Sequence, residues 1–331
     1  MKSIFSATFF LFFSSFIFAQ SDVEPLDQHL TTVTYPYSVH MFTFKSQGQL
    51  LSMAYMDVKP ENYNGKNILL LHGKNFNGAY WEKTIGELTK KGYRVIVPDQ
   101  IGFGKSSKPA HYQYSFHQLS ANTKLILDTL GVKKTVVLGH SMGGMLATRF
   151  ALLFPEMTEK LILENPIGLE DYNTLTTWQT INKTFESELK NTFETYKKYQ
   201  LTYYYDNKWK PEYDRWLTML AGWTLHEDYP IIAWNSALTS DMIITQPVVY
   251  EFKNVKVPTL LIIGTRDRTA IGKDRAPKEY QSKMGLYNEL GKKTHRQIKN
   301  SKLVELENIG HMPHIEAFDK FFSALSKFLD D

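Results

Sequence analysis

The sequence predicts an α/β fold: a mostly parallel central sheet with helices on both faces, and a helical cap inserted between two late strands. Short apolar runs without polar alternation recur along the chain, separated by longer segments of helical character. Such runs are typical of strands that are buried on both faces, as in a parallel sheet. Polar residues suited to chemistry follow several of the runs, at the sheet edge where ligands of such folds bind.

The first half of the chain contains most of the predicted sheet. A pair of strands near a Gln47-Gly48 turn opens it, and helices that end at Gly92, Gly131 and Pro155 separate the later strands. We therefore assign residues 20–165 and 257–331 to the core. The predicted strands are 38–44, 50–58, 67–71, 93–98, 135–138 and 160–163, and the predicted helices are 79–91, 115–130 and 142–154.

Residues 166–256 interrupt this alternation with a polar, aromatic and mostly helical segment. Strands resume at 259–263 and 303–306, and a helix is predicted over 317–329. Because the sheet is incomplete until the chain returns, we interpret 166–256 as a helical cap, or lid, rather than a separate domain. Most of its aromatic side chains are expected to form the core of the cap, with Trp178, Trp223 and Trp234 as candidates for lining a pocket.

Composition limits the classes of function. The chain has 331 residues, of which 43 % are hydrophobic, and its formal net charge of +4 is spread over short lysine pairs. This pattern predicts a globular protein that does not bind nucleic acid. The chain contains no cysteine, so disulfides and cysteine metal sites are excluded. We predict no cofactor and no metal.

The first 19 residues have the pattern of a secretory signal peptide. Lys2 precedes a largely apolar run that ends at Ala19, a small residue suited to cleavage. The run is short for a membrane span and is interrupted by Ser and Thr. We expect an exported protein, periplasmic or secreted, without stable membrane insertion after cleavage.

The strongest motif is Gly139-His140-Ser141-Met142-Gly143, which fits G-x-S-x-G between a predicted strand and a predicted helix. In this context Ser141 is the candidate nucleophile. Gly139 and Gly143 are needed because side chains there would collide with the neighbouring strand and helix, and His140 is expected to support the turn. The start of the helix at Met142 directs its N–H groups toward the serine oxygen.

A serine hydroxyl needs a base, and the base needs an acid that orients it. His311 follows the strand 303–306 and is the preferred base, with His314 as its rival. Asp267 follows the strand 259–263 and is the preferred acid, with Glu164 as the alternative. The order Ser141, Asp267, His311 is the order that hydrolases of this motif use.

An oxyanion also needs preorganised donors. We predict the backbone N–H of Met142 as one donor and that of Lys74 as the other, or that of Asn75 if the loop is shifted. Gly73 allows the backbone to approach a substrate, and His72 is expected to have a structural role.

Together, His72-Gly73, residues 98–106, the serine turn, Asp267 and His311 resemble the α/β-hydrolase superfamily, in its capped, esterase-like branch. The resemblance extends from about residue 39 to residue 328. It implies that the Asp99–Ser106 loop is scaffold beside the site. Relatives that hydrolyse epoxides or haloalkanes place aspartate at the nucleophile position, which Ser141 argues against. The segment after His72-Gly73 departs from the family's usual apolar pattern.

The resulting hypothesis is a carboxylic ester hydrolase that acts on a small-molecule acyl substrate, or on a related lactone or thioester, through an acyl-enzyme. Because the base must be neutral, activity is expected to fall as the pH drops through roughly 6 to 7. The alternatives are C–C bond or amide hydrolysis by the same fold, and a ligand sensor with low turnover.

Overall fold

The computed structural model describes residues 23–331, and the predicted signal peptide lies outside this range. One eight-stranded sheet, in the order β1-β2-β4-β3-β5-β6-β7-β8, organises the chain. The pairs β1–β2 and β2–β4 are antiparallel and all other neighbours are parallel, so the predicted fold class is confirmed. The strands are β1 (Val39–Ser46), β2 (Gln49–Val58), β3 (Asn67–Leu71), β4 (Arg94–Pro98), β5 (Thr135–His140), β6 (Thr158–Glu164), β7 (Thr259–Gly264) and β8 (Ser301–Leu306).

Helices cover both faces of the sheet because the central strands are apolar on both faces. In β3, Leu69 and Leu71 enter one hydrophobic cluster while Ile68 and Leu70 enter the other. This alternation buries every side chain of the strand after its first residue. The core helices are α1 (Glu82–Lys90), α2 (Phe116–Thr129), α3 (Met142–Leu153), α9 (Lys278–Gln281), α10 (Tyr287–Gln297), α11 (Pro313–Glu316) and α12 (Phe318–Asp330), with 3₁₀ turns η2 (Gly78–Trp81), η4 (Phe252–Asn254) and η5 (Lys273–Arg275).

One helical prediction needs correction, and one helix was missed. The segment predicted as one helix over 79–91 begins as the 3₁₀ turn η2, whose N-cap is Asn77, and becomes α-helical only at Glu82. Helix α10 was not predicted. Its buried face consists of Tyr287, Gly291 and Thr294, and most of the other residues of α10 are charged or polar, so little of its sequence is apolar.

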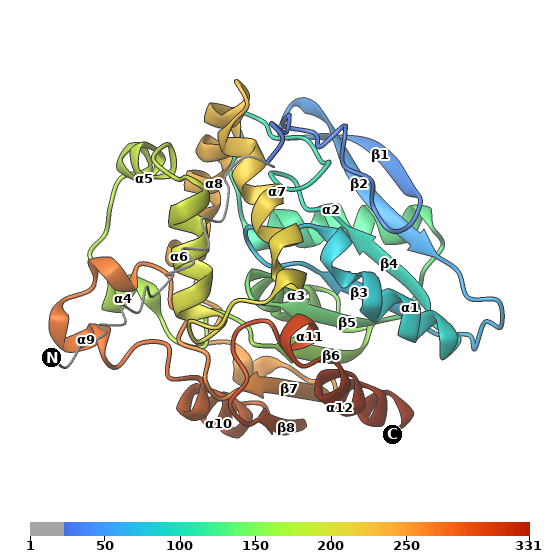
Figure 1. Cartoon of the computed structure of the whole chain (residues 1–331). Coiled ribbons are helices and arrows are strands. Elements are labelled where there is room, and N and C mark those ends of the chain that lie inside the picture. Colours follow the sequence, from blue (N-terminus) through green and yellow to red (C-terminus); the bar gives the residue numbers. More distant parts are fainter. Residues whose placement is uncertain (1–22) are drawn as a thin grey trace, which may run out of the picture.

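The segment between β6 and β7, which we call the insert, is helical. Figure 1 shows α5 to α8 together on one side of the molecule, above α3 and away from β7 and β8. Within residues 23–331 no helix is long and apolar enough to cross a membrane. The insert contains α4 (Tyr172–Leu175), α5 (Ile181–Glu188), α6 (Phe193–Tyr203), η3 (Pro211–Tyr213), α7 (Asp214–Thr224) and α8 (Tyr229–Thr245).

Residues 24–37, here called the strap, connect the insert to the core before the first strand. The N–H of Leu26 donates to the carbonyl of Gly222 on α7 at 2.9 Å, and the indole of Trp223 donates to the carbonyl of Asp27 at 3.1 Å. At its other end, the Tyr35 hydroxyl donates to Asp99 Oδ2 at 2.7 Å. The strap therefore joins α7 to the loop that follows β4.

Candidate active site

Ser141 lies on the sharp turn between β5 and α3. Its backbone has φ 55° and ψ −121°, a strained conformation for a residue with a side chain. A Cβ on Gly139 would lie 2.0 Å from the carbonyl oxygen of Gly143, and one on Gly143 would lie 2.1 Å from that of Leu71. The two glycines therefore let the strand, the turn and the helix pack closely enough to hold the serine in this strained turn.

The structure brings Ser141, His311 and Asp267 together. The Ser141 Oγ lies 2.9 Å from His311 Nε2, and His311 Nδ1 lies 2.6 Å from Asp267 Oδ2. The three side chains follow β5, β8 and β7, whose carboxyl ends meet at one edge of the sheet. Ser141 is 6 % exposed, His311 1 % and Asp267 0 %, so the hydrogen-bonded chain is shielded from water.

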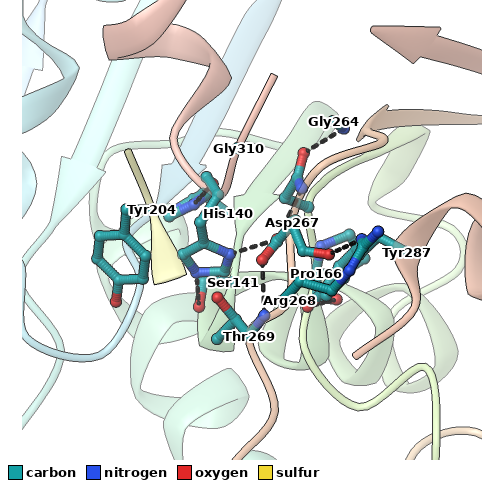
Figure 2. Close-up of polar contacts among 12 residues, drawn as sticks. His140, Ser141, Pro166, Tyr204, Gly264, Asp267, Arg268, Thr269, Tyr287 and Gly310 are labelled. Carbon is teal, nitrogen blue, oxygen red and sulfur yellow. Dashed lines mark hydrogen bonds and ion pairs between the residues drawn. The ribbon is translucent and has the colours of Figure 1, made fainter. Parts of the chain in front are cut away.

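Asp267 is fixed from two further directions. Its Oδ1 accepts the backbone N–H of Thr269 and its Oδ2 accepts the side-chain amide of Asn165, each at 2.8 Å. Asn165 in turn accepts the N–H of Gly264 at the end of β7. Figure 2 shows these contacts around Asp267. Asn165 was not predicted as a site residue, although it directly follows β6 and polar residues at strand ends are site candidates in this fold.

Tyr204, at the end of α6, stacks on the imidazole of His311 with ring centroids 4.8 Å apart and an interplanar angle of 26°. In Figure 2, Tyr204 and Asp267 lie on opposite sides of Ser141. Burial raises the pKa of the Tyr204 phenol well above its usual value, so this ring is neutral. No local sequence signal distinguished it from the other tyrosines of the insert.

His140 connects the two loops that flank the nucleophile. Its Nε2–H donates to the carbonyl of His311 at 2.8 Å, which leaves Nδ1 to accept the Tyr80 hydroxyl at 3.1 Å. The Tyr80 oxygen accepts the N–H of Gly73 at 2.9 Å. Burial, followed by the nearby His311 and His314, lowers the pKa of His140 well below its ordinary value, so the imidazole is neutral.

His72 uses both ring nitrogens on backbone groups. Nδ1–H donates to the carbonyl of Gly73 at 2.9 Å, and Nε2 accepts the N–H of Gln100 at 3.0 Å. Burial lowers its pKa. Asp99, at the start of the neighbouring loop, accepts the N–H groups of Gly78 and Lys105. These contacts fix the loops that carry the predicted oxyanion donors.

The predicted oxyanion donors lie beside the nucleophile. A Cβ on Gly73 would be 3.0 Å from the Cβ of Ser141, so the residue that follows Gly73, Lys74, is adjacent to the serine. Within residues 23–331, the backbone N–H of Lys74 has no hydrogen-bond acceptor. Met142 is the first residue of α3, where helical N–H groups lack partners in the helix.

The two rejected candidates pair with each other. Glu164 Oε1 accepts both the backbone N–H and the Nδ1–H of His314, each at 2.8 Å. The His314 ring also stacks against Trp81, with ring centroids 4.4 Å apart. Neither residue contacts Ser141 through its side chain, whereas His311 does and Asp267 bonds to His311, so the geometry matches the preferred candidates for base and acid.

A small cavity of about 30 Å³ lies between the loop at Asn75 and the insert. Of the three tryptophans considered from the sequence, Trp223 lines it, whereas Trp178 is 62 % exposed and Trp234 donates to the carbonyl of Ala110. Within residues 23–331 no group of three metal-ligating side chains is present. The cavity is lined by Asn75, Gly102, Phe103, Glu188, Tyr196, Leu220, Trp223, Tyr229, Ile232, Ala233 and Ser236.

Comparison with known proteins places this site in context. A probable hydrolytic enzyme from Pseudomonas aeruginosa PAO1 is 51 % identical, with a TM-score of 0.92 over 93 % of this chain and 99 % of that chain. An enol-lactonase from Burkholderia xenovorans LB400 shares the fold, with a TM-score of 0.66 and 20 % identity over 88 % of this chain and all of that one.

The relatives found by sequence similarity are also named as hydrolases. An AB hydrolase superfamily protein from Bacillus subtilis is 26 % identical over 80 % of this chain and 92 % of its own length. A 2-hydroxy-6-oxononadienedioate/2-hydroxy-6-oxononatrienedioate hydrolase from Comamonas testosteroni is 39 % identical over 32 % of this chain, and the match spans only 38 % of that protein. The family model for the alpha/beta hydrolase fold matches residues 66–318. The chain therefore belongs to the alpha/beta hydrolase fold family.

Proposed function

We propose that this protein is a serine hydrolase that cleaves a carboxylic ester, or a related acyl compound, through an acyl-enzyme. The observation that carries the proposal is the continuous hydrogen-bonded chain from Ser141 Oγ through His311 to Asp267 Oδ2. An alcohol becomes a competent nucleophile when a positioned base takes its proton and a carboxylate fixes that base. Burial of all three side chains strengthens these contacts.

In the first half of the reaction, Ser141 Oγ attacks the carbonyl carbon and its proton passes to Nε2 of His311. The carbonyl π electrons move to oxygen, and the N–H groups of Met142 and Lys74 stabilise that charge. Asp267 stabilises the imidazolium without taking its proton. When the tetrahedral intermediate collapses, the bond to the alcohol breaks and His311 gives the proton to the departing oxygen.

In the second half, water replaces the alcohol. His311 removes a proton from the water as its oxygen bonds to the acyl carbon, and it returns that proton to Ser141 Oγ as the acyl–serine bond breaks. The contact with Tyr204 limits rotation of the imidazole during both transfers. The insert acts as a cap in this proposal, since Tyr204 and the cavity wall come from it.

The test is covalent labelling followed by turnover. A fluorophosphonate probe is expected to modify wild-type protein at Ser141, and a panel of 4-nitrophenyl esters is expected to be hydrolysed over many turnovers. Ser141→Ala should lose both properties. Ser107→Ala serves as the control because Ser107 lies outside the site and bonds the N–H of Ser52. Labelling elsewhere, or a single turnover with retained product, would instead favour a ligand sensor.

We also propose that the protein is exported, on the basis of residues 1–19. Expression of the full chain should yield a mature form that begins close to residue 20. Amino-terminal sequencing of the purified protein tests this, and a mature form that retains Lys2 contradicts it.

A further inference from the structure

The side chain of Lys74, the residue that carries one proposed oxyanion donor, is largely buried against the insert. Its side chain is only 12 % exposed, and its ammonium points into the insert. Nζ donates to Ser236 Oγ on α8 at 2.6 Å and lies 3.5 Å from Glu188 Oε1 at the end of α5. A buried ammonium is stable only when anions or acceptors surround it, so these two residues keep the charge in place.

The ion pair between Lys74 and Glu188 is loose. At 3.5 Å it is longer than a normal charge-assisted hydrogen bond, and the second Glu188 oxygen is occupied by the side-chain amide of Asn191 at 3.0 Å. An ammonium has three donors, and only the contact with Ser236 has a short distance. The Lys74 ammonium can therefore donate a further, shorter hydrogen bond to a carboxylate that lies closer than that of Glu188.

Glu188 and Ser236 both line the cavity beside Asn75, which is only about 30 Å³ while Glu188 is in place. An acyl group can therefore enter it only by displacing the Glu188 side chain, and it would then lie adjacent to the Lys74 ammonium. Much of the remaining wall is apolar, including Phe103, Leu220 and Ile232. Glu188 is the one carboxylate among the described residues that line it. A ligand that matches this wall has a short apolar middle and a negative end.

Glu188 lies at the end of α5, a surface helix of the insert that packs on α8 through Phe185 and Trp234. None of the eight residues of α5 is buried, in contrast to α7 and α8, which bury six and nine residues respectively. Displacing the Glu188 side chain moves a polar group at the helix end and leaves the contact of Phe185 with Trp234 in place. A ligand carboxylate that replaces it would keep the local charge balanced, because one anion leaves as the other arrives.

We propose that Lys74 recognises a carboxylate on the acyl side of the substrate, and that Glu188 occupies this position while the site is empty. This inference rests on the proposed ester hydrolysis and specifies its substrate class as half-esters of short dicarboxylic acids. The backbone N–H of Lys74 serves the scissile carbonyl, while its side chain binds the far end of the same acyl group.

The test uses two esters of equal length, ethyl butanoate and monoethyl succinate, in which a terminal methyl group is replaced by carboxylate. The measured quantity is the ratio of kcat/KM for the succinate to that for the butanoate, from ethanol release. Wild type is expected to favour the succinate. Lys74→Met should lower the ratio about tenfold or more, because it removes a charge-assisted contact, and Lys74→Arg should largely preserve it.

Glu188→Gln gives a prediction of the opposite sign. It removes the competing carboxylate and should raise the same ratio, whereas the matched change Glu186→Gln, on the exposed part of α5, should leave it unchanged. Equal ratios in wild type, Lys74→Met and Glu188→Gln, with both esters hydrolysed, would overturn the inference and leave the proposed function standing.

Calorimetric titration of Ser141→Ala with monoethyl succinate separates recognition from turnover. Binding that weakens about tenfold on adding Lys74→Met supports the inference even if ethyl esters turn over slowly. Binding that is unaffected by Lys74→Met overturns it. Failure of Ser141 labelling would count against the proposed function, whereas binding that does not depend on Lys74 would count against the inference, so the two failures are distinguishable.

Discussion

Glu164 bonds to the turn that carries His311, the proposed base: one carboxylate oxygen accepts two donors of His314, three residues after His311, while the Glu164 carbonyl accepts the N–H of Ser141 at 3.2 Å. A single residue at the end of β6 is thus bonded to the nucleophile turn and to the histidine turn. The distance between base and nucleophile depends on this shared support.

We expect Glu164→Ala to lower the free energy of unfolding by about 2–5 kcal/mol, because two buried donors of His314 lose their acceptor. Glu164→Gln keeps an acceptor oxygen and should cost less. Urea denaturation of both variants measures the difference, with Glu159→Ala on the exposed side of β6 as control. Equal, small losses for Ala and Gln would show that the pair does not stabilise the turn.

Asp267→Asn should reduce kcat by about 10⁴-fold while the protein stays folded, because an amide favours the wrong imidazole tautomer of His311. Ester hydrolysis and circular dichroism together check this. Asp274→Asn, at an exposed position in η5, is the matched control and should be fully active. Substantial activity in Asp267→Asn would remove Asp267 from the proposed mechanism.

Gly143→Ala should destabilise the protein by about 1–3 kcal/mol, since the new Cβ would meet the Leu71 carbonyl at 2.1 Å and push the helix from the strand. Thermal and urea unfolding measure it. Gly86→Ala in α1 is the control, because its Cβ meets only the Tyr37 hydroxyl at 3.3 Å. If the two variants unfold alike, close packing at the nucleophile turn is not required.

Lys108 should make stability depend on pH. Burial lowers the pKa of its amine from 10.5 to about 7, and Nζ donates to the carbonyls of Gly104 and Ser106. Between these two pKa values the unfolded chain binds more protons than the folded one. The free energy of unfolding of wild type, relative to Lys108→Met, should therefore rise with pH by up to about 1.4 kcal/mol per unit.

Urea unfolding of both proteins from pH 6 to 9 tests this difference, which should be flat near pH 6 and rise above about 7. Lys133→Met, at an exposed position before β5, should follow wild type throughout. Parallel curves for wild type and Lys108→Met would mean that this amine stays protonated in the folded protein.

Most of the fold was predictable because strands such as β3, β5 and β7 are continuous apolar runs that end at recognisable turns. Helix α10 was not, because its face toward the sheet is short and includes Gly291, whose Cβ would lie 3.0 Å from Ile263, while the rest of its sequence is mostly charged or polar. Ser141 was identifiable from its motif and strand–turn–helix context. Tyr204 and the Glu164–His314 pair depend on long-range packing, which no local pattern encodes.

The strap fixes one side of the insert to the core. Helix α7 makes hydrogen bonds with Leu26 and Asp27, and Asp228, beside α8, accepts the N–H of Gln28. This side of the insert is therefore held by residues 26–28. On the other side of the insert none of the residues of α5 is buried, so we expect substrate to enter and leave on that side. Removing the residues up to 28 would break these hydrogen bonds. We therefore expect such trimming to loosen α7 and to change access to Ser141, far along the sequence from the cut.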